Sequence, residues 1–185
     1  MVRSATAPTG TERTFGEDEL IVSKTDPKGI IQYANDVFLR IAALTEGDAI
    51  GKPHSVIRHP DMPKAVFKAL WDTISNGQEM FAYIVNLAAD GAHYWVFAHV
   101  TPTFGAGGRI VGYHSNRRLP DRRPIAEVEP LYARLRAEER RHGTGSAALD
   151  ASSAQLGEFL AERGQTYDEF VWSITPTDSA PRGSR

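Results

Sequence analysis

The fold is decided by residues 80–115, MFAYIVNLAADGAHYWVFAHVTPTFGAGGRIVGYHS. Three runs within this stretch, residues 80–87, 94–104 and 109–115, are rich in the β-branched and aromatic residues that strands favour. Short glycine-containing segments separate the runs, so each run is joined to the next by a hairpin connection. The stretch therefore predicts a three-stranded antiparallel meander.

Two shorter strands and several helices are expected before this meander. Apolar runs at residues 20–22 and 30–33 flank a turn at residues 26–29 that contains Pro and Gly, a pattern that predicts a hairpin. Asn35 is expected to cap a first helix, and Pro63 to begin a longer one. The sequence thus predicts an α+β fold, with a five-stranded antiparallel sheet and helices on one face.

A helical extension is expected after the sheet. Apolar side chains recur at helical spacing along residues 121–141: Ile125, Val128, Leu131, Tyr132 and Leu135. This stripe is too narrow for a stable free helix, so helix 121–141 is expected to pack on the sheet or on a second copy and to be the output element. Residues 142–153 resemble a flexible linker and residues 154–174 a short helical segment. Residues 1–14 and 175–185 are expected to be flexible or disordered tails.

Composition excludes several classes of site. The chain has 185 residues and no cysteine, so it can form neither disulfides, nor thiolate metal sites, nor a cysteine adduct with a flavin. Its 21 Lys+Arg nearly balance 23 Asp+Glu, and this balance predicts neither nucleic acid nor membrane as a partner. The sequence shows no signal peptide and no run of ~20 apolar residues, which favours a cytoplasmic location.

Residues 58–63, Arg-His-Pro-Asp-Met-Pro, crowd several polar groups into one loop between helices. This string resembles the FAD-binding PAS domain of bacterial aerotaxis transducers. Other matching pieces follow in the same order from about residue 11 to residue 120: Thr14-Phe15, Tyr33-Ala34-Asn35-Asp36-Val37-Phe38, Phe67-Lys68-Ala69-Leu70-Trp71, Asn86, His93-Tyr94-Trp95-Val96, Val100-Thr101-Pro102 and Val111-Gly112-Tyr113. The resemblance implies a PAS domain over residues 15–120, a role in signal transduction and an FAD cofactor.

A flavin site requires an apolar slot for the ring, polar groups at the ring edge and cations for the phosphates. Phe67 and Trp71 lie four residues apart on one helix face and suit the slot, although core packing explains them equally. Asn35 and Asn86 suit the ring edge; a buried Asn needs partners, which backbone groups also supply. Arg58 suits the phosphates, because a guanidinium group pairs bidentately with phosphate.

Four further residues complete the expected site. Asp61 shares the loop of Arg58, and a salt bridge between the two is the simpler alternative. His59 is expected to cap a helix or to hydrogen-bond Asp61, with haem ligation as a further alternative. Trp95 lies in a strand whose cofactor-facing side the sequence does not identify. His114 is placed beside the reactive ring edge by resemblance to light-sensing PAS domains, where it would gain a proton when reduction adds negative charge nearby.

The predicted function is that of a cytoplasmic sensor that binds a flavin, FAD in the first place, and responds to redox state or oxygen. No Ser/His/Asp, metal-binding or phosphate-loop pattern indicates an enzyme. The expected partner is another protein or a second copy, bound through the C-terminal helix. Two alternatives stay open: a cofactor-free PAS dimerisation or docking module, and a haem-binding oxygen sensor. His54 and His93 are expected at the surface.

Overall fold

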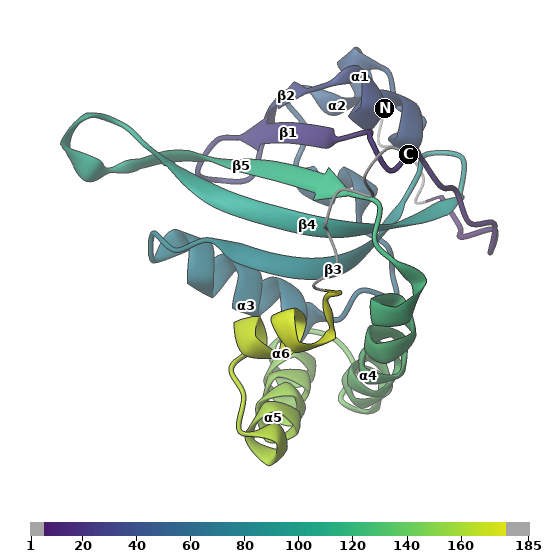
Figure 1. Cartoon of the computed structure of the whole chain (residues 1–185), viewed down its shortest axis with the longest axis vertical. Coiled ribbons are helices and arrows are strands. Elements are labelled where there is room, and N and C mark those ends of the chain that lie inside the picture. The colour runs from purple at the N-terminus through teal and green to yellow at the C-terminus, as the bar shows by residue number, and fades with distance from the viewer. Residues whose placement is uncertain (1–5, 177–185) are drawn as a thin grey trace, which may run out of the picture.

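The computed structural model describes residues 6–176 and contains a five-stranded antiparallel sheet (Figure 1). Its strands are β1 (Ile21–Thr25), β2 (Ile31–Ala34), β3 (Met80–Leu87), β4 (His93–Phe104) and β5 (Ile110–Arg118). The strand order is β2-β1-β5-β4-β3, so the meander β3–β5 joins the first hairpin through β1 and β5. This arrangement confirms the predicted five-stranded antiparallel sheet.

The junction between β1 and β5 requires a glycine. Residues 21–25 of β1 pair with residues 113–117 of β5, with Ser23 opposite Ser115. A Cβ atom at Gly112 would lie 2.2 Å from the carbonyl oxygen of Thr25. Any larger residue at position 112 would therefore push the two strands apart where the hairpin of β1 and β2 meets the meander.

One face of the sheet, here called the inner face, is covered by the helical elements between β2 and β3. They are α1 (Asp36–Ala42), α2 (Glu46–Ala49), the short 3₁₀ helix η1 (His54–Ile57) and α3 (Lys64–Ser75). The Asn35 side chain caps α1, as predicted: its Oδ1 accepts the backbone N–H of Phe38 at 3.0 Å. Pro63 is the N-cap of α3 rather than its first residue, and it brings no capping side chain.

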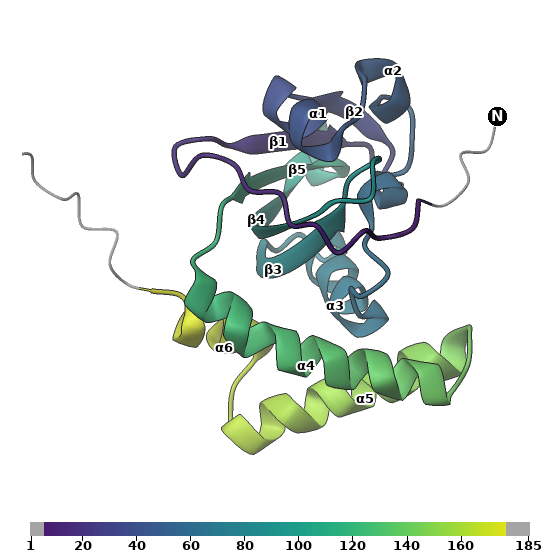
Figure 2. The same ribbon diagram turned by 90° about the vertical axis from the view of Figure 1, so that its right-hand side faces the viewer.

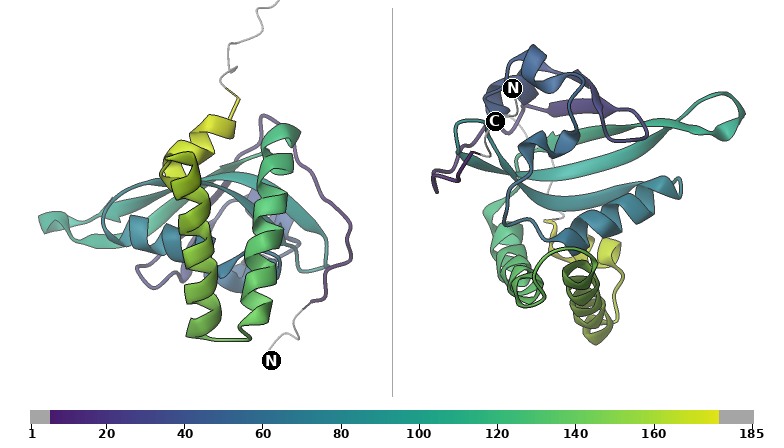
Figure 3. Two further views of the ribbon diagram at one scale, coloured as in Figure 1. Left: turned by 90° about the horizontal axis from the view of Figure 1, so that it is seen from below. Right: turned by 180° about the vertical axis from the view of Figure 1, so that it is seen from behind.

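The opposite face, here called the outer face, carries three helices. They are α4 (Arg122–Arg141), α5 (Ser146–Arg163) and α6 (Tyr167–Ile174). Figure 2 shows this layer on the side of the sheet away from α1 and α2, and Figure 3 shows α4 and α5 running antiparallel beside each other. α5 also packs against α3, and α6 returns to β3. The helix α4 contains Pro130 on its exposed side.

The apolar stripe of α4 is buried within the same chain. Leu131 and Leu135 are almost inaccessible, and the Tyr132 hydroxyl donates a 2.7 Å hydrogen bond to the backbone carbonyl of Tyr83 on β3. The stripe therefore packs within the chain, on β3 of the sheet and on the neighbouring helices α5 and α3.

The linker expected at residues 142–153 is mostly helix. α5 begins at Ser146 and leaves only a short connection after α4. Ala148 and Ser152 lie four residues apart, and both are fully buried. The small residues that indicated flexibility instead allow α5 to approach its neighbours closely, because a short side chain keeps helix axes near each other.

The described parts of the expected tails are also ordered against the sheet. The backbone N–H of Arg13 donates to the carbonyl of His93 at 2.7 Å, and Thr9 bonds Gly91 in the same way. At the other end, the Thr175 and Tyr83 hydroxyls are 2.8 Å apart. The remainder of both expected tails, residues 1–5 and 177–185, lies outside the described residues.

Over residues 6–176, no helix is both long enough and apolar enough to cross a membrane.

Candidate ligand pocket

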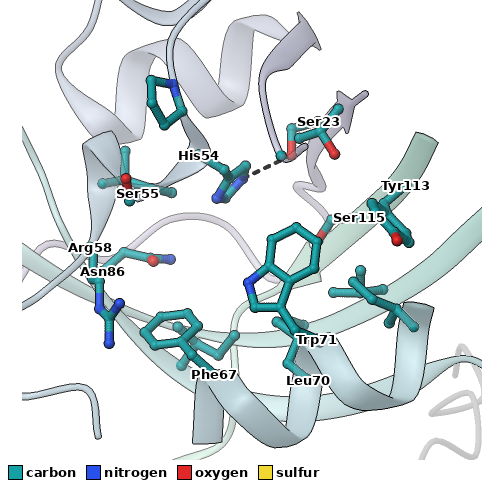
Figure 4. A pocket seen from close by; sticks show the side chains of 18 of the residues that line it. Ser23, His54, Ser55, Arg58, Phe67, Leu70, Trp71, Asn86, Tyr113 and Ser115 are labelled. Atoms are coloured by element: carbon teal, nitrogen blue, oxygen red, sulfur yellow. Dashed lines mark hydrogen bonds between the residues drawn. The ribbon is translucent and has the colours of Figure 1, made fainter. Parts of the chain in front are cut away.

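A cavity of about 290 Å³ lies between the inner face of the sheet and α3 (Figure 4). Its volume is just below the roughly 300–1,000 Å³ typical of small-molecule sites. Residues of β1, η1, α3 and the meander strands β3, β4 and β5 line it. The elements α1, α2 and β2 do not contribute to its wall. Such a cavity accommodates a flat ring system whose longer substituents leave through the opening.

The walls of the pocket are apolar because of two regular spacings. Helical spacing turns one face of α3 toward the sheet: Phe67, Leu70, Trp71 and Ile74. Strand alternation brings small and branched side chains of β3 and β4 to the floor: Ile84, Ala98 and Val100. The result is a slot with one helical and one flat wall.

Trp71 stands at the mouth of the pocket. It is 40% exposed, and its ring meets that of Tyr113 edge to face with centroids 5.5 Å apart. Gly29, at φ +78°, passes so close that an added Cβ would lie 3.1 Å from the indole. A residue with a side chain at position 29 would therefore displace Trp71 as well as strain the turn.

Two exposed cations line the opening of the pocket, Lys28 next to Gly29 near Trp71 and Arg58 beside Asn86 (Figure 4). The guanidinium group of Arg58 stacks over the ring of Phe67, 4.1 Å from its centroid, and Lys28 is exposed on the turn between β1 and β2. Burial lowers the pKa of Arg58, but an arginine keeps its charge at neutral pH. The mouth can therefore hold an anionic substituent of a ligand.

The inner end of the pocket holds a buried positive charge. Arg117 is 4% exposed, and one of its nitrogens donates to Ser23 Oγ at 3.0 Å and to His54 Nε2 at 2.6 Å. A guanidinium group only donates hydrogen bonds, so Nε2 must accept and His54 is neutral with its proton on Nδ1. Burial and the charge of Arg117 lower the pKa of His54 to about 3.

Arg117 itself stays charged. Burial lowers its pKa to about 10, which is still well above neutral pH, and no carboxylate of the described residues counteracts that effect. A buried charge without a partner of opposite sign is costly. This end of the pocket therefore favours a ligand that brings negative charge or strong hydrogen-bond acceptors.

Three buried polar atoms of the pocket lack a hydrogen-bond partner within the described part of the chain. They are Asn86 Nδ2, Ser115 Oγ and one terminal nitrogen of Arg117. Buried polar groups are nearly always paired in native proteins, and an unpaired one costs about 1–3 kcal/mol. Two of the three, Asn86 Nδ2 and the Arg117 nitrogen, only donate hydrogen bonds, so a ligand with acceptor atoms would satisfy them.

The pocket brings together four of the residues expected from the sequence: Arg58, Phe67, Trp71 and Asn86. Asn35 lies outside it, because both ends of its amide are used locally. Besides capping α1, its Oδ1 accepts the N–H of Val22 and its Nδ2 donates to the carbonyl of Leu20. Its interactions are those of a structural cap.

His114 also lies outside the pocket. Alternation along β5 turns Tyr113, Ser115 and Arg117 to the inner face and His114, between them, to the outer face. The proton exchange with a bound ring that was expected of His114 therefore has no geometric basis.

The last three expected residues line a different cavity. His59, Asp61 and Trp95 border a hollow of about 510 Å³ between the 59–61 loop, the start of β4 and α4. His59 is buried, and its Nδ1 accepts the backbone N–H of Asp61 at 3.1 Å, which is the local role expected first. Trp95 is on the outer face and stacks with Tyr132, with ring centroids 6.2 Å apart.

Sequence reasoning missed the polar inner end of the pocket. His54 was expected at the surface but is half-buried against Arg117 and Ser23. Arg117 was not among the expected site residues, because it is followed directly by Arg118 and adjacent arginines are typical of a solvated surface. Strand alternation from Tyr113, which the resemblance had singled out, would have brought Ser115 and Arg117 to the same face.

Comparison with known proteins identifies the sheet and its inner helices. The family model described as "PAS fold" matches residues 31–117. The aerotaxis receptor of Escherichia coli K12 is 40% identical over 123 residues, which are 66% of this chain and 24% of the receptor. A nitrogen fixation regulatory protein of Klebsiella pneumoniae is 26% identical over 115 residues, 62% of this chain and 22% of that protein. The chain thus spans about a quarter of the length of these relatives.

Solved structures show the same fold at low sequence identity. The light-state structure of the blue-light photoreceptor Aureochrome1 LOV superposes with a TM-score of 0.51 at 22% identity, covering 62% of this chain and 88% of that chain. A light-oxygen-voltage domain studied with a flavin analogue gives a TM-score of 0.52 at 18% identity, covering 66% and 87%. Both comparisons concern the fold alone.

Proposed function

Residues 31–117 form a PAS domain, and from this premise we propose that the chain is a sensor module that binds a flavin, FAD in the first place, in the inner-face pocket. One observation carries the proposal: buried hydrogen-bond donors without a partner in the described part of the chain line an otherwise apolar slot. A flavin ring has an apolar body and a pyrimidine edge rich in acceptors, which suits this arrangement. The 40% identity to the aerotaxis receptor supports the same reading.

The residues present fit such a cofactor in three ways. Phe67, Leu70 and Trp71 would enclose the ring and exclude water from it. The amide of Asn86 would donate to an acceptor of the ring edge. Arg58 at the mouth would pair with a phosphate, which favours FAD or FMN over riboflavin.

A bound flavin supplies reversible electron transfer, and the inner end of the pocket would bias it. The fixed positive charge of Arg117 favours any ligand form that carries more negative charge. His54 stays neutral beside it, because protonation would place two buried cations in contact. We therefore propose redox state or oxygen as the signal.

We propose that the output passes through α4–α6 to a protein partner or a second copy. These helices cover the outer face, and α3 contacts both the pocket and α5. A change in the pocket therefore reaches the helical layer through one shared element.

Haem is a weaker candidate for the same cavity. His59, the ligand expected for haem, faces the other cavity. His54 does line the pocket, but its Nε2 is engaged by Arg117 and Ser23. A metal would have to break both contacts to reach that nitrogen.

The test is the visible spectrum of the purified chain, followed by titration of the ligand-free protein with FAD, FMN and riboflavin. We expect flavin absorption, and weaker binding of riboflavin than of the two phosphorylated forms. Colourless protein that binds none of the three would overturn the proposal and leave the cofactor-free docking module. A Soret band would select haem instead.

A further inference from the structure

Glu139, in the last turn of α4, is a carboxylate that is only 1% exposed. Its Oε1 accepts the backbone N–H of Lys64 at 2.6 Å, and its Oε2 pairs with Arg136 one turn earlier. Burying a carboxylate is unfavourable unless such partners compensate. The side chain therefore ties α4 to the first residue of α3.

The contact supplies a cap that α3 does not provide for itself. Pro63 occupies the N-cap position and offers no side-chain acceptor, so the first amides of this 12-residue helix depend on other groups. A carboxylate at a helix N-terminus also interacts favourably with the positive end of the helix dipole. Glu139 fulfils both functions from a distant part of the chain.

Arg58 lies at the same turn of α3. Its guanidinium group stacks on Phe67, which belongs to the first turn of that helix, and it lines the mouth of the pocket. The negative charge of Glu139 raises the pKa of Arg58 and opposes the lowering by burial and by Arg136. The field of Glu139 therefore extends to the cation that faces the ligand.

We propose that Glu139 is an electrostatic latch between the pocket and α4, and that an anionic substituent of the ligand weakens it. A phosphate at Arg58 would compete with Glu139 for the same positive region, and ligand binding would thereby loosen the end of α4 from α3. The identity of the ligand rests on the proposed function, whereas the latch itself is a property of the ligand-free chain.

Because of thermodynamic linkage the effect is reciprocal. If ligand binding weakens the contact of Glu139 with α3, this contact must weaken ligand binding by the same factor. Glu139→Gln keeps an oxygen for the Lys64 amide but removes the charge. We expect this variant to bind FMN and FAD about fivefold more tightly or better. Its affinity for riboflavin, which lacks phosphate, should stay unchanged.

Glu138→Gln is the matched control. Glu138 belongs to the same turn of α4 but pairs with Arg141 and His142, each at 3.0 Å, near the helix end. Its neutralisation should leave the affinity for all three flavins unchanged. Equal tightening in both variants, or tightening for riboflavin as well, would overturn the latch.

A second experiment needs no flavin. In the ligand-free protein, urea unfolding of Arg58→Gln, Glu139→Gln and the double variant forms a double-mutant cycle. We expect the unfolding equilibrium constant of the double variant to depart at least about twofold from the product of the single effects. If the effects of the two substitutions on the free energy of unfolding are strictly additive, the latch is overturned even if flavin binds. If the two effects are coupled but the chain binds no flavin, only the proposed function is overturned.

The wild-type chain provides a readout if Glu139→Gln fails to fold. Hydrogen exchange of the Lys64 amide and of the last turns of α4 should accelerate when FMN is bound, compared with riboflavin. Equal protection in the two complexes would contradict the proposal.

Discussion

Alternation along β5 assigns neighbouring side chains to different tasks. Ser115 and Arg117 reach the pocket, whereas His114, Asn116 and Arg118 point to the outer face or to solvent. Substitution of two adjacent residues of similar chemistry can therefore affect ligand binding in one case and not in the other. A residue of β5 that faces away from the pocket is thus a matched control for its neighbour that faces the pocket.

Asn86→Leu should weaken flavin binding without weakening the fold. The Nδ2 atom of Asn86 is buried and unpaired, so its replacement by an apolar group of similar size removes an unsatisfied donor. We expect at least tenfold weaker FAD binding, measured by titration, and an unchanged or higher melting temperature of the ligand-free protein. Asn116→Leu, on the other face, should bind FAD normally.

Arg117→Gln should make the midpoint potential of the bound flavin more negative. Reduction adds negative charge, and the buried guanidinium group favours it only while the positive charge is present. A tenfold loss of that preference corresponds to about 59 mV for one electron, which sets the scale of the expected shift. The midpoint potentials of Arg117→Gln and Arg118→Gln are to be measured by spectroelectrochemistry. Equal potentials in the two variants would show that Arg117 does not influence the potential of the flavin.

His54 should make the fold less stable in mild acid. Its pKa is about 3 in the folded chain and about 6.5 when unfolded, so between these values only the unfolded state is protonated. Stability is therefore full above pH 6.5 and falls as the pH decreases toward 3. Urea unfolding at pH 7 and pH 5 should show wild type losing about 1–2 kcal/mol more than His54→Asn. Parallel losses in the two proteins would show that His54 is accessible to protons in the folded state.

At the scale of elements, α3 belongs to the wall of the pocket and also contacts the helices of the outer layer. Its Phe67 and Trp71 face the pocket, its first turn receives Glu139 of α4, and α5 packs along it. Movement of α3 by a bound ligand must therefore be accommodated by the helices of the outer layer. The helical layer and the pocket are linked through a contiguous set of contacts.

Leu135→Asp should release α4 and α5 from the domain. Leu135 is fully buried, and an unpaired carboxylate at this position is incompatible with packing. We expect a loss of several kcal/mol in the docking of α4, visible as faster hydrogen exchange in α4 and α5 while β3–β5 stay protected. Arg134→Asp, at an exposed position of the same helix, should leave exchange unchanged. Loss of sheet protection together with α4 would instead show that helices and sheet unfold as one unit.

At the scale of the whole molecule, the sequence predicted the sheet better than the helical layer. Strands and hairpins depend on local alternation and turn residues, and residues 80–115 contain both. The burial of α5 depends on contacts with distant helices, so Ala148 and Ser152 resembled a linker. Arg117 was missed for the same reason: its environment arises only when β5 pairs with β1 and η1 brings His54 beside it.

Removal of α6 should expose an aromatic surface and cause self-association. Trp172 packs on Phe81 and Phe97 of the outer face, with its ring centroid 4.7 and 6.0 Å from theirs. Thr175, directly after α6, contacts the hydroxyl of Tyr83. A chain that ends after Gly164 should sediment with a mass that rises with concentration, because apolar patches of this kind drive association. A chain that ends after Pro176 keeps α6 and should sediment like the full chain. If both shortened chains stay the same size, the outer face is not a latent interface.

Pro130 lies within α4, between the start of the helix and the turn that carries Glu139. A proline within a helix lacks the amide proton and crowds the carbonyl four residues earlier, so the bending stiffness falls at that one point. Tyr132 and Leu135 follow Pro130 and are buried like Ile125 before it, so α4 stays fixed to the domain on both sides of the proline. Opening the molecule at Glu139 would therefore move only the turns after Leu135 and the short connection that leads into α5.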